Sequence, residues 1–117
     1  MANLRLNDVT PRGAVHTIYP AAKEFGVSGH IMESILSSIY NQLGALDGAS
    51  LDQKKVIAEN PEYPETLQVG NWFFNDSTVK QALEEGLISK VDGNYVLTEK
   101  AKKVFQRASE IKKQLWG

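Results

Sequence analysis

Apolar residues recur at three- and four-residue spacing over residues 31–43, which predicts an amphipathic helix there. The stripe consists of Ile31, Met32, Ile35, Leu36, Ile39, Tyr40 and Leu43. Ser28 precedes it as a candidate cap, and Gly44 follows it as a stop signal. A stripe this wide predicts the central core helix, and an interface between two copies through Ile35 and Ile39 is the alternative.

A shorter stripe precedes this helix, made of Val15, Ile18, Tyr19, Ala22 and Phe25. Thr10 followed by Pro11 is a good helix start, and Gly26 is a plausible stop. Pro20 lies inside the stripe and is expected to kink or split the helix, because proline removes a backbone donor. Residues 4–6 alternate between apolar and polar and predict a short strand or an arm.

The middle of the chain is less regular. Ser50 and Gln53 form a capping-box pattern that predicts a short helix over roughly residues 51–59. Residues 60–65 contain two prolines and predict a loop. The apolar residues between positions 67 and 74 are compatible with a strand, a hairpin or an irregular buried segment.

The last forty residues give the clearest signals. Asp76 or Ser77 is a candidate cap for a helix over about residues 78–85, which Gly86 ends. Residues 87–91 and 94–97 read as two strands around the tight-turn dipeptide Asp92–Gly93. Thr98 then caps a last helix, whose apolar stripe consists of Ala101, Val104, Phe105, Ala108, Ile111 and Leu115.

This order of helix, glycine, hairpin and capped helix resembles the winged helix-turn-helix superfamily over about residues 77–108. The segments that carry the resemblance are ALEEGLI at residues 82–88 and YVLTEKA at residues 95–101. Ala101 stands where the superfamily usually has glycine. The resemblance implies a mainly α domain with a small β-hairpin, in which the hairpin is the wing and the helix before it is the recognition helix. The predicted helix at 51–59 lies too far upstream for a short helix-turn-helix connection.

The resemblance also implies contacts with double-stranded DNA. Gln81 would pair with adenine, and Lys80 would meet guanine or phosphate. The outward face of the recognition helix would present Thr78, Lys80, Gln81 and Glu84; Lys90 and Asn94 would flank the wing turn; and Lys100, Lys102, Lys103 and Arg107 would attract the backbone. Glu84 and Glu85 weigh against this role because they are negatively charged. The wing also weighs against it, because it carries Asp92 and only one lysine.

Charged residues are distributed unevenly along the chain. The net charge is −1, which does not suggest a protein that coats nucleic acid. Residues 1–77 hold five basic and nine acidic side chains, whereas residues 78–117 hold eight basic and five acidic ones. The positive C-terminal part fits a phosphate-facing patch, and a lysine-rich helix that serves solubility is the plainer interpretation.

Candidate chemistry is sparse. The chain has no cysteine, and His16 and His30 are its only imidazoles, so we expect no metal site, no cofactor and no catalysis. No apolar run approaches the roughly 20 residues that span a bilayer, and no signal peptide is evident, so we expect a cytoplasmic protein without membrane contact.

These patterns predict a single domain over residues 1–117, with an N-terminal arm and kinked helix (1–27), core helices (28–59) and a recognition-helix, wing and last-helix unit (77–117). The first functional hypothesis is a DNA-binding transcriptional regulator that acts as a homodimer. The alternative is a protein-interaction module on the same fold, such as an adaptor, inhibitor or assembly factor. Candidate interface residues are Ile35, Ile39, Trp72, Phe73 and Trp116. An enzyme would require a buried carboxylate or histidine that faces a deep pocket.

Overall fold

A computed structural model of the chain describes residues 14–42, 64, 66–70 and 74–116, except for the side chain of Trp116. This part of the chain is mainly α-helical with one two-stranded antiparallel hairpin, as the sequence predicts. Its elements are the 3-10 helix η2 (Ala14–His16), α1 (Ile18–Phe25), α2 (Gly29–Gln42), α4 (Asp76–Glu84), β1 (Ile88–Val91), β2 (Asn94–Leu97) and α5 (Glu99–Trp116).

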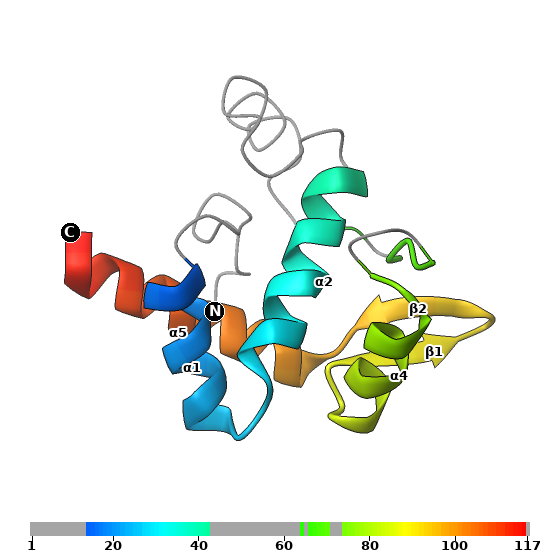
Figure 1. Cartoon of the computed structure of the whole chain (residues 1–117), viewed down its shortest axis with the longest axis horizontal. Coiled ribbons are helices and arrows are strands. Elements are labelled where there is room, and N and C mark those ends of the chain that lie inside the picture. The colour runs from blue at the N-terminus through cyan, green and yellow to red at the C-terminus, as the bar shows by residue number, and fades with distance from the viewer. Residues whose placement is uncertain (1–13, 43–63, 65, 71–73, 117) are drawn as a thin grey trace.

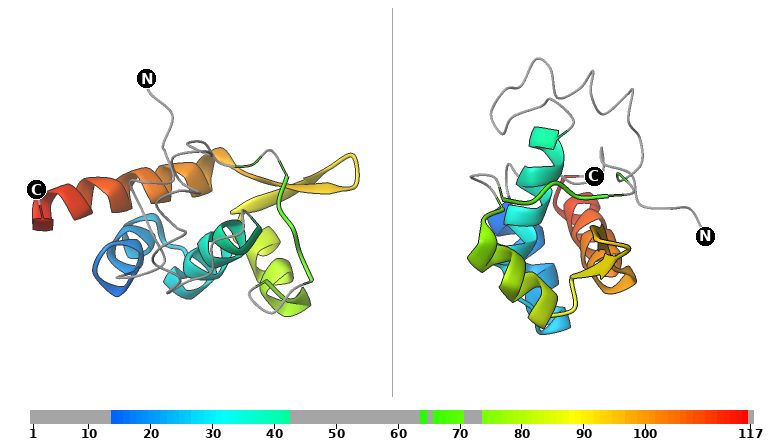
Figure 2. Two further views of the ribbon diagram at one scale, coloured as in Figure 1. Left: turned by 90° about the horizontal axis from the view of Figure 1, so that it is seen from above. Right: turned by 90° about the vertical axis from the view of Figure 1, so that its right-hand side faces the viewer.

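The helices form two layers. α1, α2 and α4 lie in a row, and α5 and the hairpin lie together on one side of that row (Figures 1 and 2). α1 packs against both α2 and α5, and α2 packs against α4. The hairpin projects past α4 at the end of the molecule opposite the C-terminal end of α5 (Figures 1 and 2). The hairpin tip is therefore the most extended feature at that end.

The connection between α1 and α2 is tight. Gly26 ends α1 with a φ of 70°, and the N–H of Val27 donates to the carbonyl of Ala22 at 3.0 Å. Helices commonly end with a residue in the left-handed conformation, followed by a residue whose N–H donates to a carbonyl in the last turn. Glycine adopts the left-handed conformation without steric cost. The predicted stop at Gly26 is confirmed. The Oγ of Ser28 accepts from the N–H of Ile31 at 3.4 Å, which confirms Ser28 as the cap of α2.

The helical segment that contains Pro20 is split at Thr17, between η2 and α1, as the sequence predicts. α1 begins at Ile18, so Pro20 lies in its first turn. Backbone N–H groups in the first turn have no partner within the helix, and the missing donor therefore costs nothing there. The predicted helix start at Thr10 and Pro11 lies outside the described residues.

Gly29 allows α1 and α2 to cross closely. A Cβ atom on Gly29 would lie 2.9 Å from Cγ and 3.1 Å from Cα of Tyr19. Beyond this contact, the Tyr19 hydroxyl donates to Oε1 of Glu33 at 2.9 Å, and this hydrogen bond raises the pKa of Tyr19 above its ordinary value. The side chains of Tyr19 and Glu33 thus fasten the two helices together on the outer side of the crossing.

The hairpin has the predicted turn. Ile88 pairs with Leu97 and Val91 pairs with Asn94, which leaves Asp92 and Gly93 at the tip with φ values of 52° and 82°. Two consecutive positive φ values match the right-handed twist of the strands, and an Asp–Gly pair tolerates them. The confirmed register turns Ile88 and Leu97 toward the core, where both are buried.

A third segment touches the hairpin. Leu67 forms an isolated antiparallel bridge with Tyr95, and its N–H donates to the Tyr95 carbonyl at 2.8 Å. Phe74 is fully buried in the core. Among the described residues of this segment, Leu67 and Phe74 are buried and Gln68, Val69 and Gly70 are exposed, and the bridge at Leu67 is their one strand-like contact.

The core lies between the two layers. α5 contributes Ala101, Val104, Phe105 and Ala108, each fully buried, as its predicted stripe requires. The Oγ1 of Thr98 accepts from the N–H of Ala101 at 3.3 Å, which confirms Thr98 as the cap of α5. Among the described side chains, Tyr40, Phe74 and Phe105 are the bulkiest that are completely buried.

Ile35 and Ile39, which the sequence also offers as interface residues, are both 0% exposed within a single copy. α2 packs against α1 on one side and α4 on another, so it needs apolar residues on most of its circumference. The prediction of α2 as the central core helix is confirmed. The predicted interface residues Trp72 and Phe73 and the side chain of Trp116 lie outside the described residues.

Three further predictions also lie outside the described residues: the arm at residues 4–6, the helix at 51–59, and the loop at 60–65 apart from Pro64. The predicted boundaries of the N-terminal, core and C-terminal units stay predictions.

Candidate nucleic-acid interface

The cap of α4 lies one residue before the predicted caps, Asp76 and Ser77. The Oδ1 of Asn75 accepts from both the N–H and the hydroxyl of Thr78, each at 3.1 Å. Asn75 is thus the cap, and Asp76, predicted as a cap, instead lies in the first turn, where its negative charge suits the helix dipole.

Thr78 does not lie on the outward face of α4, contrary to prediction. It is only 8% exposed and shares the inner face with Val79 and Ala82, which lie one and four residues farther along. Its hydroxyl is paired with Asn75. The outer face presents Ser77, Lys80, Gln81 and Glu84, all exposed, so three of the four residues predicted for this face lie on it.

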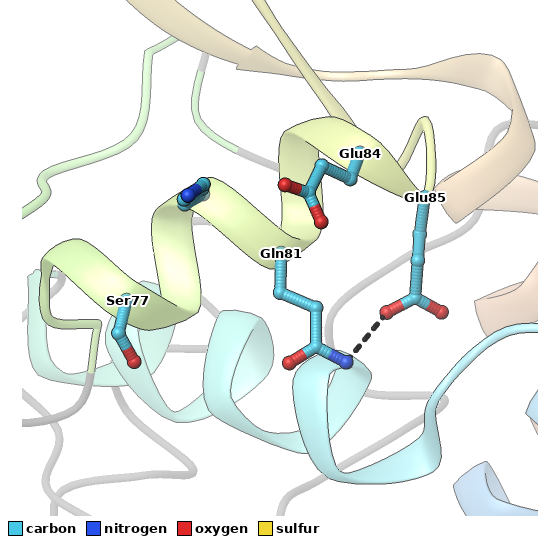
Figure 3. A pocket seen from close by; sticks show the side chains of 5 residues that line it. Ser77, Gln81, Glu84 and Glu85 are labelled. Atoms are coloured by element: carbon cyan, nitrogen blue, oxygen red, sulfur yellow. Dashed lines mark hydrogen bonds between the residues drawn. The ribbon is translucent and has the colours of Figure 1, made fainter.

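The exposed face borders a shallow hollow of about 430 Å³, lined by Ser77, Lys80, Gln81, Glu84 and Glu85 (Figure 3). Gln81 and Glu85 point from α4 toward the N-terminal part of α2 (Figure 3). The lining is polar and open to solvent, which suits contacts with a large polar surface better than enclosure of a small molecule.

Glu85 connects α4 to the beginning of α2. Its Oε1 accepts from the backbone N–H of Ser28 at 2.7 Å, and its Oε2 accepts from Nε2 of Gln81 at 3.0 Å. A carboxylate is favourable at a helix N-terminus, where backbone N–H groups lack partners and the dipole is positive. The charge of Glu85 is thus directed at α2, which weakens the objection that it repels DNA.

The residues that follow α4 also bind the beginning of α5. Nζ of Lys100 donates to the Glu85 carbonyl at 3.0 Å, and the Thr98 hydroxyl donates to the Gly86 carbonyl at 2.6 Å. Gly86 has a φ of 75°, which lets the chain turn from α4 into β1. The beginnings of α2 and α5 are thus both hydrogen-bonded to residues 85 and 86, at the end of α4.

The hairpin contributes two of the predicted residues. Asn94 is exposed beside the turn. Lys90 is exposed, and its Nζ lies 5.6 Å from the centroid of the Tyr95 ring, within reach of a cation–π attraction. Val91 is also exposed, at 51%, so the tip offers polar and apolar surface together.

The cations of α5 are partly neutralised within the molecule. Arg107 donates from Nε to Glu24 of α1 at 2.9 Å and from Nη1 to Glu110 at 3.4 Å. These hydrogen bonds, the one to Glu24 first, raise the pKa of Arg107. Lys102 lies 3.6 Å from Glu99. Of the four residues that the sequence assigned to phosphate attraction, only exposed Lys103 has no partner among the described residues.

α1 and α2 are joined by only three residues, Gly26, Val27 and Ser28, a short connection that sequence reasoning did not consider as a reader of DNA. In DNA-binding helix-turn-helix proteins, the second helix presents an open face to the major groove. α2 offers no such face, because every residue from Ile35 to Tyr40 is buried. The better candidate is α4, whose exposed polar face leads directly into the hairpin.

The described residues meet the requirements of neither a metal site nor a membrane span. No group of three or more His, Asp or Glu side chains among them is placed to hold a metal ion. His16 and His30 are both exposed. No described helix is long and apolar enough to cross a membrane.

Comparison with known proteins does not assign the chain to a family. No protein-family model matches the chain, and no curated protein or solved structure matches it either. Its function is therefore inferred from its own residues and their arrangement.

Proposed function

We propose that this chain is a winged-helix module that binds double-stranded DNA, with α4 in the major groove and the β1–β2 hairpin as the wing. The observation that carries the proposal is the direct succession of an exposed polar helix face and a projecting hairpin (Figure 1). A helix fits the major groove, where Gln81 offers a donor and an acceptor to adenine and Lys80 reaches guanine or phosphate.

The proposal includes pairing of two copies and a role in transcriptional regulation. One recognition helix with a single lysine on its outer face gives few phosphate contacts, and specific sites bound by small domains are commonly contacted twice. A homodimer would double the contacts at a two-fold symmetric site. Sedimentation equilibrium of the free protein and of its DNA complex would measure the stoichiometry.

The test is a titration of a labelled random-sequence duplex with the full chain, followed by fluorescence anisotropy at several salt concentrations. We expect affinity to fall linearly with salt on logarithmic axes, because bound phosphates release counterions. Lys80→Gln should weaken binding and reduce the magnitude of the slope by about one, as loss of one phosphate contact does.

Lys113→Gln is the matched control. It removes the same charge near the C-terminal end of α5, at the opposite end of the molecule from the hairpin (Figure 1). It should leave both slope and affinity nearly unchanged. Absence of binding at low salt would overturn the DNA proposal, and equal effects of the two variants would remove α4 from it.

A protein-interaction module is the second candidate, and one observation favours it. Leu83 of α4 is 38% exposed and Val91 of β1 is 51% exposed, so the proposed DNA-contacting unit also carries apolar surface. A protein partner bound there would lose affinity on Leu83→Ser, whereas DNA binding through Lys80 and Gln81 would be little affected by it. The same variant thus separates the two functions.

A further inference from the structure

The carboxylate of Glu85 has two partners of different kinds. Oε1 accepts from the backbone N–H of Ser28, which belongs to the cap of α2 and is distant in sequence. Oε2 accepts from Nε2 of Gln81, one helical turn earlier on α4 (Figure 3). The contact with Ser28 fixes the carboxylate, and the fixed carboxylate in turn holds the Gln81 amide.

This arrangement determines which end of the Gln81 amide faces Glu85. A carboxylate has no hydrogen to donate, so it binds the NH₂ end of the amide and not the oxygen. One N–H is then used, and the second N–H and the oxygen stay available. An amide donor paired with an amide acceptor is the combination that binds N7 and the N6 amino group of adenine in the major groove.

We infer that Glu85 is a positioning residue that orients Gln81 for recognition of adenine, an inference that rests on the proposed binding of DNA. Glu85 itself touches no base. It removes the rotational freedom of the Gln81 side chain before DNA arrives, and a side chain ordered in advance loses less entropy on binding. The same carboxylate keeps α4 in place against α2.

The variant Glu85→Gln separates these two roles. Its side-chain oxygen can still accept from Ser28, so α4 stays attached to α2. The other end of the new amide is a donor, which cannot accept from Gln81 and favours the reversed orientation of the Gln81 amide. Glu110→Gln is the matched control, because it removes the same charge from an exposed residue of α5 that lies outside the proposed DNA-contacting face of α4 and the hairpin.

The first measurement uses the free protein. Nitrogen relaxation of the Gln81 side-chain amide should show an ordered group in the unsubstituted chain and in Glu110→Gln, and a mobile group in Glu85→Ala. Equal mobility of the Gln81 amide in all three proteins would overturn the inference even if the protein binds DNA.

The second measurement selects preferred duplexes from a random library for each variant. We expect one position at which adenine is preferred, with the preference lost in Gln81→Ala and reduced by roughly fivefold or more in Glu85→Gln. Glu110→Gln should keep that preference. An unchanged preference in Glu85→Gln would overturn the inference and leave the proposed function intact, whereas failure of the unsubstituted chain to bind any duplex would overturn both.

Discussion

At the scale of single residues, the crossing of α1 and α2 depends on two side chains that sequence periodicity does not distinguish. Tyr19 belongs to an apolar stripe in the sequence, yet its hydroxyl binds Glu33 outside the core. Gly29 has no role in the predicted helix stripe, yet a side chain there would meet the backbone of Tyr19. Both roles come from contact between helices, which periodicity within one helix cannot indicate.

The Tyr19 hydroxyl should titrate above its ordinary pKa of 10.0, because ionisation would break its hydrogen bond to Glu33 and place two negative charges together. The bond should therefore stabilise the fold fully below pH 10 and lose its effect as pH rises through the raised value. Removal of the hydroxyl in Tyr19→Phe should cost about 0.5–1.5 kcal/mol of unfolding free energy at neutral pH.

Urea denaturation at neutral pH and a tyrosinate absorbance titration measure the two effects. Glu33→Gln is the control for the cause of the shift, since it keeps an oxygen acceptor without the charge. It should lower the pKa of Tyr19 only in part, because the hydrogen bond, the largest cause of the raised pKa, can still form. The difference between the titration curves of the unsubstituted chain and Tyr19→Phe reports the ionisation of Tyr19, and a midpoint at or below pH 10 would contradict this account.

At the scale of elements, the hairpin and the last helix were predictable from local signals. The tip at Asp92 and Gly93 and the cap at Thr98 each depend on residues a few positions apart, and the structure confirms both. The inner and outer faces of α4 were harder to predict, because its short stripe of apolar residues does not show that a neighbouring element covers Thr78. The bond from Ser28 to Glu85 joins residues 57 positions apart, which no local pattern reveals.

The start of α4 gives a prediction for one element. Asn75→Ala should destabilise the protein by about 0.5–2 kcal/mol, because two donors of Thr78 lose their acceptor. Ser77→Ala, which alters a candidate cap from the sequence, should change the stability far less. Thermal unfolding followed by circular dichroism compares the two variants, and a larger loss for Ser77→Ala would return the cap to its predicted place.

At the scale of the whole molecule, Arg107 and Glu24 join α5 to α1 across the surface. Both side chains are partly exposed, so solvent screens their attraction and the pair should contribute little to stability. A double-mutant cycle with Arg107→Gln and Glu24→Gln should give a correspondingly small coupling. The coupling should shrink in high salt, and a value that does not depend on salt would argue against a screened ion pair.

The packing of α1 against α5 has a consequence for synthesis of the protein. Residues made early, on α1, meet their partners on α5 only when that helix has been made. Until α5 leaves the ribosome, the apolar face of α1 that packs against α5 stays exposed, and contacts between residues close in sequence cannot bury it. Folding should therefore be completed after translation of α5 and not step by step along the nascent chain, and the unfinished chain should be the form most exposed to chaperones and proteases.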